Sequence, residues 1–284
     1  MAAETTQDPN AQVEEASPGF VHNMLAGIGA PILELYGTLR DMVRILGLTI
    51  YYIINGKGGP RRRNDIISQM YEIGNRSIVF IAVTLGFLGM ILIFQAGFQA
   101  NRITGDLSLL GALFLQLLLR EFAPTITAMM LATRVGTGMA AQLGSMVVTE
   151  QVDALRMSGA QPVDYLVVPR FIAALIMMVV LTVFAIIVSF IAGAITANAF
   201  YGVNPRTFVD FGMLTWFDLW IGMAKAIAYG IAVPITACQA GLSVVGGSEG
   251  VGLATTKAVV NASLAVIVLD FIISGIGYAI LAIL

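Results

Sequence analysis

The sequence predicts an all-α polytopic membrane protein with an amino-terminal interfacial amphipathic helix, five transmembrane helices and a short cytoplasmic coupling helix. Three observations support this prediction. Hydrophobic residues make up 58% of the 284 residues and charged residues only 11%, which is unlike a soluble domain. The apolar residues gather in five runs long enough to cross a bilayer. The segments between these runs are short, so we expect no separate soluble domain.

The first 64 residues precede the predicted membrane domain. Residues 1–19 are polar and acidic, without the basic start and apolar core of a signal peptide, and we expect a disordered tail. Residues 20–64 form an interfacial helical segment that ends in a basic turn. Their apolar residues recur at close to helical spacing, but charged residues interrupt them, and the uncharged stretch 45–55 is too short to span. A helix lying in the membrane interface fits this pattern.

Residues 65–284 form the predicted membrane domain. Its expected spans are residues 77–98, 107–133, 166–199, 219–245 and 258–284. The second is the least apolar, because Arg120, Glu121 and Pro124 lie within it. With the amino terminus in the cytoplasm, most loop Lys and Arg residues lie inside, and only Arg102 and Arg206 lie outside. The positive-inside rule therefore predicts an extracytoplasmic carboxyl terminus.

Several function classes are excluded by composition. A formal net charge of −2 gives no reason to expect nucleic-acid binding. The single cysteine, Cys238, and the single histidine, His22, make a histidine metal cluster or a catalytic triad improbable, so we expect no metal, no cofactor and no enzyme. Residues 246–252 are glycine-rich, but no Gly-Lys-Ser/Thr follows them. We therefore expect a flexible cytoplasmic turn there, and ATP bound on a different subunit.

The cytoplasmic segment between the second and third spans contains a candidate coupling helix at 149–157. Thr149 is expected to cap it, and Glu150 and Asp153 favour its positive amino end. Gly159 is expected to stop it. A short, rigid, charged helix on the ATP side would suit a permease that receives force from a partner. The alternative is an ordinary solvated loop helix.

Apart from Arg170 near the cytoplasmic end of the third span, four charged residues lie inside the expected spans: Arg120, Glu121, Lys225 and Asp270. Intramembrane charges are costly and usually face a partner or a wet cavity. Depth along the spans favours pairing Arg120 with Asp270, both near the midplane. Glu121 could then meet Lys225, although the depths of these two residues match less well. A structural ion pair and a role on a substrate path both remain open for Arg120 and Asp270. Lys225 could instead extend to the outer interface.

The chain contains a set of short motifs: Arg120-Glu121-Phe122-Ala123-Pro124, Thr127-Ala128, Arg134-Val135-Gly136, Gly144-Ser145-Met146, Thr149-Glu150-Gln151, Ala154-Leu155, Pro162, Pro169-Arg170, Gly252-Leu253-Ala254-Thr255-Thr256 and Ala258-Val259-Val260. Taken together, these motifs resemble the MlaE/YrbE permease family, and the resemblance runs from about residue 63 to the carboxyl end. Asp153-Ala154-Leu155 with Gly159 also loosely resembles the Glu-Ala-Ala loop of ABC importer permeases. One departure is Gln142, where the family pattern suggests a glutamate, and this puts an ionic role there in doubt.

The resemblance implies a homodimeric lipid permease, with phospholipid as the expected substrate, in the bacterial inner membrane. Its implied partners are a cytoplasmic ABC ATPase that binds ATP and Mg, an extracytoplasmic MCE-domain protein and a small cytoplasmic accessory subunit. The expected ATPase-coupling residues are Thr149, Glu150, Gln151, Asp153 and Leu155. A small-solute ABC permease or channel is the alternative function. An intramembrane enzyme is a third reading, but no residues resemble an activated nucleophile or a metal site.

The first span supplies the expected lipid path. A five-span subunit has too few helices to enclose a diacyl lipid, so we expect a symmetric pair around an outward-opening apolar cavity. The apolar stripe along the first span, which would form the wall of this cavity, could instead face bulk bilayer or pack against other spans. The expected wall residues are Leu85, Leu88, Ile91, Leu92 and Gln95.

Overall fold

The computed structural model describes residues 20–55, 60–103, 105–210 and 212–282. The expected acidic tail at 1–19 and part of the basic turn, 56–59, lie outside the described residues. The chain divides into two compact units, residues 1–41 and residues 42–284. Each unit is described by itself.

Helix α1 (Phe20–Asn55) begins in the first unit and ends in the second. Within the second unit, Ile45 packs against a small apolar cluster that includes Leu143 and Val152. The Thr49 hydroxyl, which is buried, donates a hydrogen bond of 2.7 Å to the Ile45 carbonyl. The helix also exposes large apolar side chains, which is what a helix in a membrane interface requires; in the second unit these are Val43, Ile50, Tyr51, Ile53 and Ile54.

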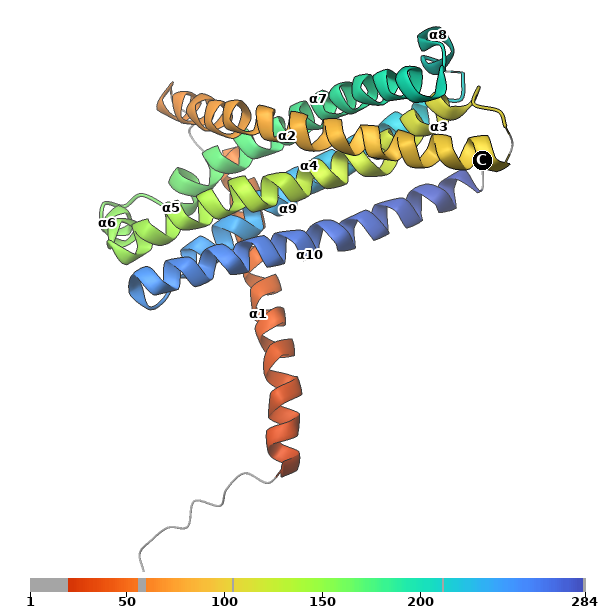
Figure 1. The fold of residues 1–284 in the computed structure, drawn as a ribbon. Helices are drawn as coiled ribbons and strands as arrows, with labels where there is room; N and C mark the ends of the chain where they lie inside the picture. The colour runs from red at the N-terminus through yellow and green to blue at the C-terminus, as the bar shows by residue number, and fades with distance from the viewer. Residues whose placement is uncertain (1–19, 56–59, 104, 211, 283–284) are drawn as a thin grey trace, which may run out of the picture. The chain divides into compact units, whose positions relative to one another are not determined.

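Five long apolar helices confirm the predicted all-α membrane fold, and no strand occurs among the residues that the structure describes. They lie lengthwise beside one another (Figure 1). The short helices α6 (Gln151–Met157) and α8 (Pro205–Phe208) lie at opposite ends of this bundle. The spans are α2 (Pro60–Ile103); the series α3 (Leu110–Leu117), η1 (Leu118–Phe122), α4 (Ala123–Leu131), η2 (Ala132–Gly136) and α5 (Thr137–Val148); η3 (Val163–Val167) with α7 (Val168–Tyr201); α9 (Trp216–Leu242); and α10 (Gly247–Leu281).

Several boundaries differ from the sequence-based expectation, and α2 begins at Pro60, so residues 60–64 of the expected basic turn are helical. The second span continues as helix to Val148, and the third begins at Val163, so most of the expected loop 134–170 is helical. Helix α10 begins at Gly247, where a flexible glycine-rich turn was expected. Gly246 and Gly247 take φ values of 97° and 71°, which favour glycine, at the end of the short turn that joins α9 to α10. The remaining glycines of the run are inside the helix.

Local chemistry explains how several of these elements begin and end. Thr215 and Asp218 form a reciprocal capping box at the start of α9. Gly202, with φ 64°, ends α7 in the left-handed conformation. Pro124 has no N–H and cannot donate to the hydrogen bonds of the helix. It lies in the first turn of α4, which directly follows the π-helical turn η1.

Small residues let the spans approach closely. A Cβ on Gly89 of α2 would lie 2.5 Å from the Ser189 carbonyl oxygen of α7. A Cβ on Gly193 would lie 2.8 Å from the Phe114 ring and 3.0 Å from Ile93. The Gly89 contact is with backbone and is closer than a real Cβ allows, so the α2–α7 packing depends on glycine at this position. At Gly193 a Cβ would instead require the side chains of Phe114 and Ile93 to shift.

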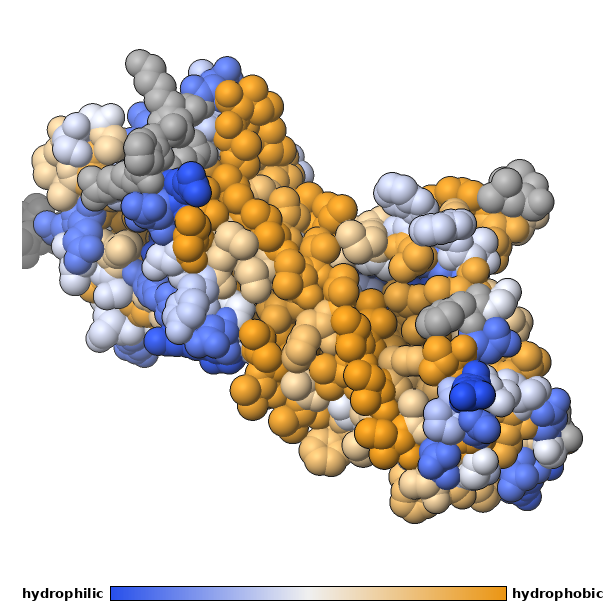
Figure 2. Space-filling view, turned by 90° about the horizontal axis from the view of Figure 1, so that it is seen from above, coloured by the Kyte–Doolittle hydropathy of each residue, from blue (hydrophilic) through white to orange (hydrophobic). Residues whose placement is uncertain are grey.

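The spans differ in how much of their surface the second unit buries. In their most apolar stretches, 67% of the residues of α9 are buried but only 11% of those of α10. Helix α9 is therefore the central helix, whereas α10 leaves most of its apolar surface uncovered. On the face seen in Figure 2, hydrophobic side chains form a continuous belt between hydrophilic groups gathered toward either end. This is the pattern that a bilayer imposes on a spanning protein.

Replacing Gly89 by alanine should destabilise the protein by ~1–3 kcal/mol, since the new methyl group overlaps backbone that cannot move freely. Thermal unfolding in detergent measures the change. Gly252→Ala is the matched control, because that glycine is exposed and has open space around it. Equal melting temperatures for the two variants would show that the α2–α7 contact is looser than described.

Candidate functional site

The candidate site is a cluster of charged and hydroxyl side chains among the second, fourth and fifth spans. Arg120 and Glu121 come from η1, and neighbouring residues of a helix point in different directions. Arg120 donates from Nε to the Oδ1 of Asp218, which is fully buried at the start of α9. The Arg120 guanidinium also lies over the ring of Tyr278, 5.7 Å from its centroid.

Lys225 of α9 is the centre of the cluster. Its side chain is fully buried, and its Nζ lies 2.5 Å from Glu121 Oε2 and 2.8 Å from Asp270 Oδ1. One ammonium therefore bridges carboxylates from the second and fifth spans. A buried ammonium is tolerated only where such partners compensate for its lost hydration.

Hydroxyl groups complete the bonding of both carboxylates. The Tyr229 hydroxyl donates to Asp270 Oδ1 at 2.6 Å, and the Thr125 hydroxyl donates to the same oxygen at 3.1 Å. The Ser274 hydroxyl lies 3.2 Å and 3.3 Å from the two oxygens of Glu121. The acidic groups are thus held by three spans at once.

The cluster has an accessible edge that is acidic. It contains two cations and three carboxylates, so it carries one excess negative charge when all five are ionised. The Glu121 and Asp270 side chains are 26% and 27% exposed, whereas that of Lys225 is not exposed at all. No group of three or more His, Cys, Asp and Glu residues that could hold a metal occurs in the described part of the chain. The accessible charged edge suits recognition of a charged or polar group.

The expected pairing of Arg120 with Asp270 is wrong, whereas Glu121 and Lys225 do meet. Arg120 pairs with Asp218 instead, and Asp270 shares Lys225 with Glu121. Asp218 was missed because the expected fourth span began one residue after it. The Thr-x-x-Asp capping pattern at Thr215 was the available sequence signal, since it places a carboxylate in the first turn of α9.

Helix α6 confirms a short helix near the expected coupling segment but corrects its cap. The Thr149 hydroxyl bonds back to the Ser145 carbonyl at 2.8 Å, so it ends α5 rather than capping α6. Glu150 precedes α6 with φ 59°, a left-handed conformation that separates the two helices. Leu155 packs partly inward, in the apolar cluster that contains buried Val152. The exposed apolar side chain of α6 is Met157, at 85%.

The expected lipid-path stripe does not form one exposed face. Leu85 is fully buried in the main apolar core, so it is excluded from an open wall. Leu88 and Leu92 are half-buried, while Ile91 and Gln95 are exposed. Six helical residues turn the chain by about 600°, which places Ile91 roughly 120° away from Leu85. The five residues expected on the lipid path therefore include both core and surface positions.

Gln142, the departure from the family pattern, makes a neutral contact. Its Oε1 lies 3.3 Å from Nη2 of Arg170, which also donates from Nη1 to the Leu166 carbonyl at 2.7 Å. The amide thus accepts a hydrogen bond from Arg170 where a glutamate would have formed an ion pair.

The Permease MlaE family model matches residues 66–276. The chain is 36% identical to a probable ABC transporter permease protein of Synechocystis sp., over 81% of this chain and 87% of that protein. It is 31% identical to the intermembrane phospholipid transport system permease protein MlaE of Haemophilus influenzae, over 91% and 99%. It is also 31% identical to the chloroplastic protein TRIGALACTOSYLDIACYLGLYCEROL 1 of Arabidopsis thaliana, over 96% and 76%.

A double-mutant cycle tests the buried pair. Arg120→Gln alone should cost ~3–5 kcal/mol of stability, because it leaves Asp218 charged and buried. The double variant Arg120→Gln/Asp218→Asn should cost less than the sum of the single variants. Arg120→Gln with Asp270→Asn is the control, and their effects should add more nearly, since these two residues do not bond to each other. Detergent unfolding measures all of them; additive effects at Arg120 and Asp218 would contradict the pairing.

Proposed function

Because the chain belongs to the MlaE permease family, we propose that it is the membrane-spanning subunit of an ABC transporter for phospholipid. It would pass lipid between the inner membrane and an extracytoplasmic MCE-domain protein, with ATP hydrolysed on a separate subunit. The observation that carries the proposal is the charge cluster around Lys225, which has an accessible edge in an otherwise apolar bundle. Such a bundle accommodates acyl chains, while the cluster offers charged and hydroxyl groups to a head group.

The orientation follows from the basic residues at the two ends of the bundle. The end that holds α6 carries most of them, and the opposite end holds Arg102 and Arg206. By the positive-inside rule, α6 faces the cytoplasm, and the carboxyl end of α10 faces outward. The basic residues at the α6 end are Arg63, Arg76, Arg134, Arg156, Arg170 and Lys257.

In this orientation, α6 is the proposed contact for the partner ATPase. Its inner side is anchored by buried Val152, so the helix is coupled to α5 and the apolar cluster beneath it. Its outer side presents polar residues and the exposed Met157, a mixture that suits a small, tightly docked interface. The outward-facing residues are Gln151, Asp153, Ala154, Arg156 and Met157.

The proposed working unit is a homodimer whose two copies enclose the lipid path. Support comes from α10, which the second unit leaves largely uncovered although it contributes Asp270 and Ser274 to the charge cluster. A second copy would cover apolar surface of this kind at a two-fold axis. Of the residues expected on the path, Ile91 and Gln95 retain exposed positions on α2.

The transport proposal predicts that Lys225→Met uncouples lipid from ATP hydrolysis. In proteoliposomes with the partner ATPase, phospholipid should stimulate hydrolysis by the unaltered complex. In the variant this stimulation should be about tenfold weaker, a change equivalent to ~1.4 kcal/mol, because the carboxylates of Glu121 and Asp270 then repel each other. Arg102→Gln, a change in an exposed residue on α2, should leave it unchanged. Stimulation by a small polar solute, with no response to phospholipid, would favour the small-solute permease.

The docking proposal predicts that Asp153→Ala/Met157→Ala weakens ATPase binding by about tenfold while the bundle keeps its stability, since both side chains point away from it. Co-purification of the ATPase measures binding, and thermal unfolding reports on the bundle. Arg206→Ala at the opposite end is the control. Undiminished binding by the double variant would refute both the docking role of α6 and its assignment to the cytoplasmic side.

A further inference from the structure

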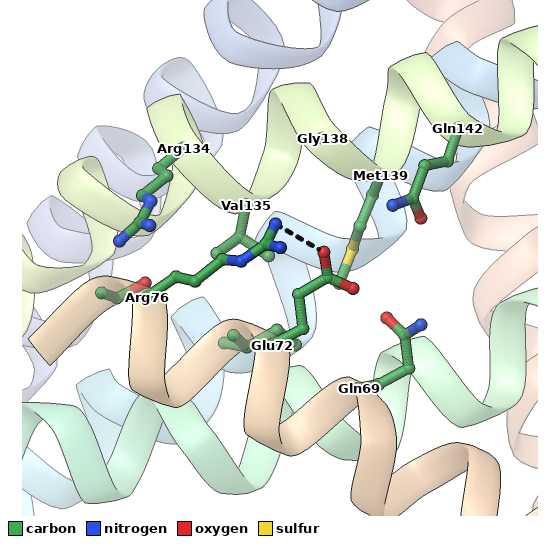
Figure 3. Close-up of a pocket in the computed structure, with 10 residues that line it drawn as sticks. Gln69, Glu72, Arg76, Arg134, Val135, Gly138, Met139 and Gln142 are labelled. Carbon is green, nitrogen blue, oxygen red and sulfur yellow. Dashed lines mark hydrogen bonds and ion pairs between the residues drawn. The ribbon is translucent and has the colours of Figure 1, made fainter.

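A polar cavity of about 210 Å³ lies between α2 and the η2–α5 stretch, away from the charge cluster around Lys225. Arg134 lies fourteen residues after Arg120 on the second span, which corresponds to about 20 Å along a helix. Figure 3 shows Arg76 reaching toward Glu72, and Arg134 extending from the facing helix toward α2. The other lining residues are Gln69, Ile73, Ser77, Val135, Gly138, Met139 and Gln142.

The cavity has an uncompensated positive charge. Arg76 Nη1 pairs with Glu72 Oε1 at 3.0 Å, which uses the single carboxylate among the lining residues. Arg134 Nη1 is buried and has no hydrogen-bond partner among the described residues. The Ser77 hydroxyl, in a residue only 2% exposed, also lacks a partner there. Two unbonded donors therefore belong to residues that line this cavity, where the oxygens of Gln69, Glu72 and Gln142 do not bond to them, and leaving buried donors unbonded is costly.

An apolar groove of about 600 Å³ adjoins this cavity and shares Arg76 and Arg134 with it. Beyond the two arginines, the groove follows the surface of α2 into its apolar run. Val79 is 70% exposed and Val83 52% exposed, so the groove opens toward the surroundings of the bundle. Its remaining lining residues are Phe80 and Thr133.

We propose that this cavity and groove form a binding site for one membrane phospholipid. The phosphate accepts hydrogen bonds from Arg134 and Ser77, and an acyl chain lies along Val79 and Val83. A guanidinium matches the phosphate oxygens in geometry and charge, and such charge-assisted bonds are stronger than neutral ones. The adjoining apolar groove favours a lipid over a free phosphate ion or a protein carboxylate, because neither of those would fill it. The site requires only that the chain lies in a bilayer, not that the bound lipid is transported.

The experiment uses full-length protein in detergent, so that bulk bilayer does not label the groove. A photoreactive residue at Val79 is irradiated with dioleoylphosphatidylglycerol, and lipid adducts are counted by mass spectrometry. Dioleoylglycerol, which has the same chains without phosphate, is the comparison ligand. A second probe at Ile267, an exposed apolar position on α10, reports non-specific labelling and an intact fold.

Phosphatidylglycerol should label Val79 far more than dioleoylglycerol does. Arg134→Gln should reduce that labelling by about tenfold, the equivalent of one charge-assisted hydrogen bond, and leave Ile267 labelling unchanged. Arg76→Gln should weaken it as well, which gives a second variant should the first fold poorly. Arg102→Gln, on an exposed residue near the other end of α2, should have no effect.

Three results would overturn the proposal. Equal labelling by the two ligands would mean that the groove binds acyl chains without reading phosphate. Excess inorganic phosphate could abolish labelling by phosphatidylglycerol and also protect Arg134 from arginine-specific modification as well as the lipid does. That pair of results would identify a site for a free anion. Loss of labelling once the partner ATPase is bound would assign the unpaired arginine to that interface.

Discussion

The buried ammonium of Lys225 is the interaction on which the packing of the second, fourth and fifth spans depends. It approaches Glu121 and Asp270, so the central helix α9 is bonded to helices on two sides. Between apolar helices in a membrane there is little hydrophobic driving force, and polar bonds and close packing must supply specificity. Removing the ammonium would leave two carboxylates facing each other, so this bridge constrains which arrangement of the spans is stable.

The polar groups of the second span lie on or beside widened helical turns. Arg120 and Glu121 lie on η1, and Arg134 lies on η2, on either side of α4. A π-helical turn inserts a residue into the helical register and so redirects the side chains that follow. Pro124, which cannot donate to the ladder, directly follows the first of these turns. The second span thus departs from regular α-helix at the positions where its charged side chains contact different neighbours.

The two polar sites carry opposite excess charge. The Lys225 cluster has one carboxylate more than it has cations, whereas the cavity beside Arg134 has one guanidinium more than it has carboxylates. A phosphate group is attracted to the second site, whereas the exposed carboxylates of the first favour a cationic or hydroxyl part of a head group. A lipid with an ammonium in its head group would meet a favourable charge at the Lys225 cluster. The two sites, which lie at different depths in the bundle, therefore attract groups of opposite charge.

The sequence by itself determined the fold class, the number of spans and the residues that carry charge inside them, because these follow from hydropathy and helical length, which are local quantities. It also predicted that Glu121 meets Lys225 and that a short helix, observed as α6, lies between the second and third spans. Only the tertiary structure decided that Arg120 pairs with Asp218, that Leu85 is in the core and that Arg134 lacks a partner. These depend on how each span is rotated about its axis and on where it begins to within one turn. Packing between helices sets that rotation, and no single helix encodes it.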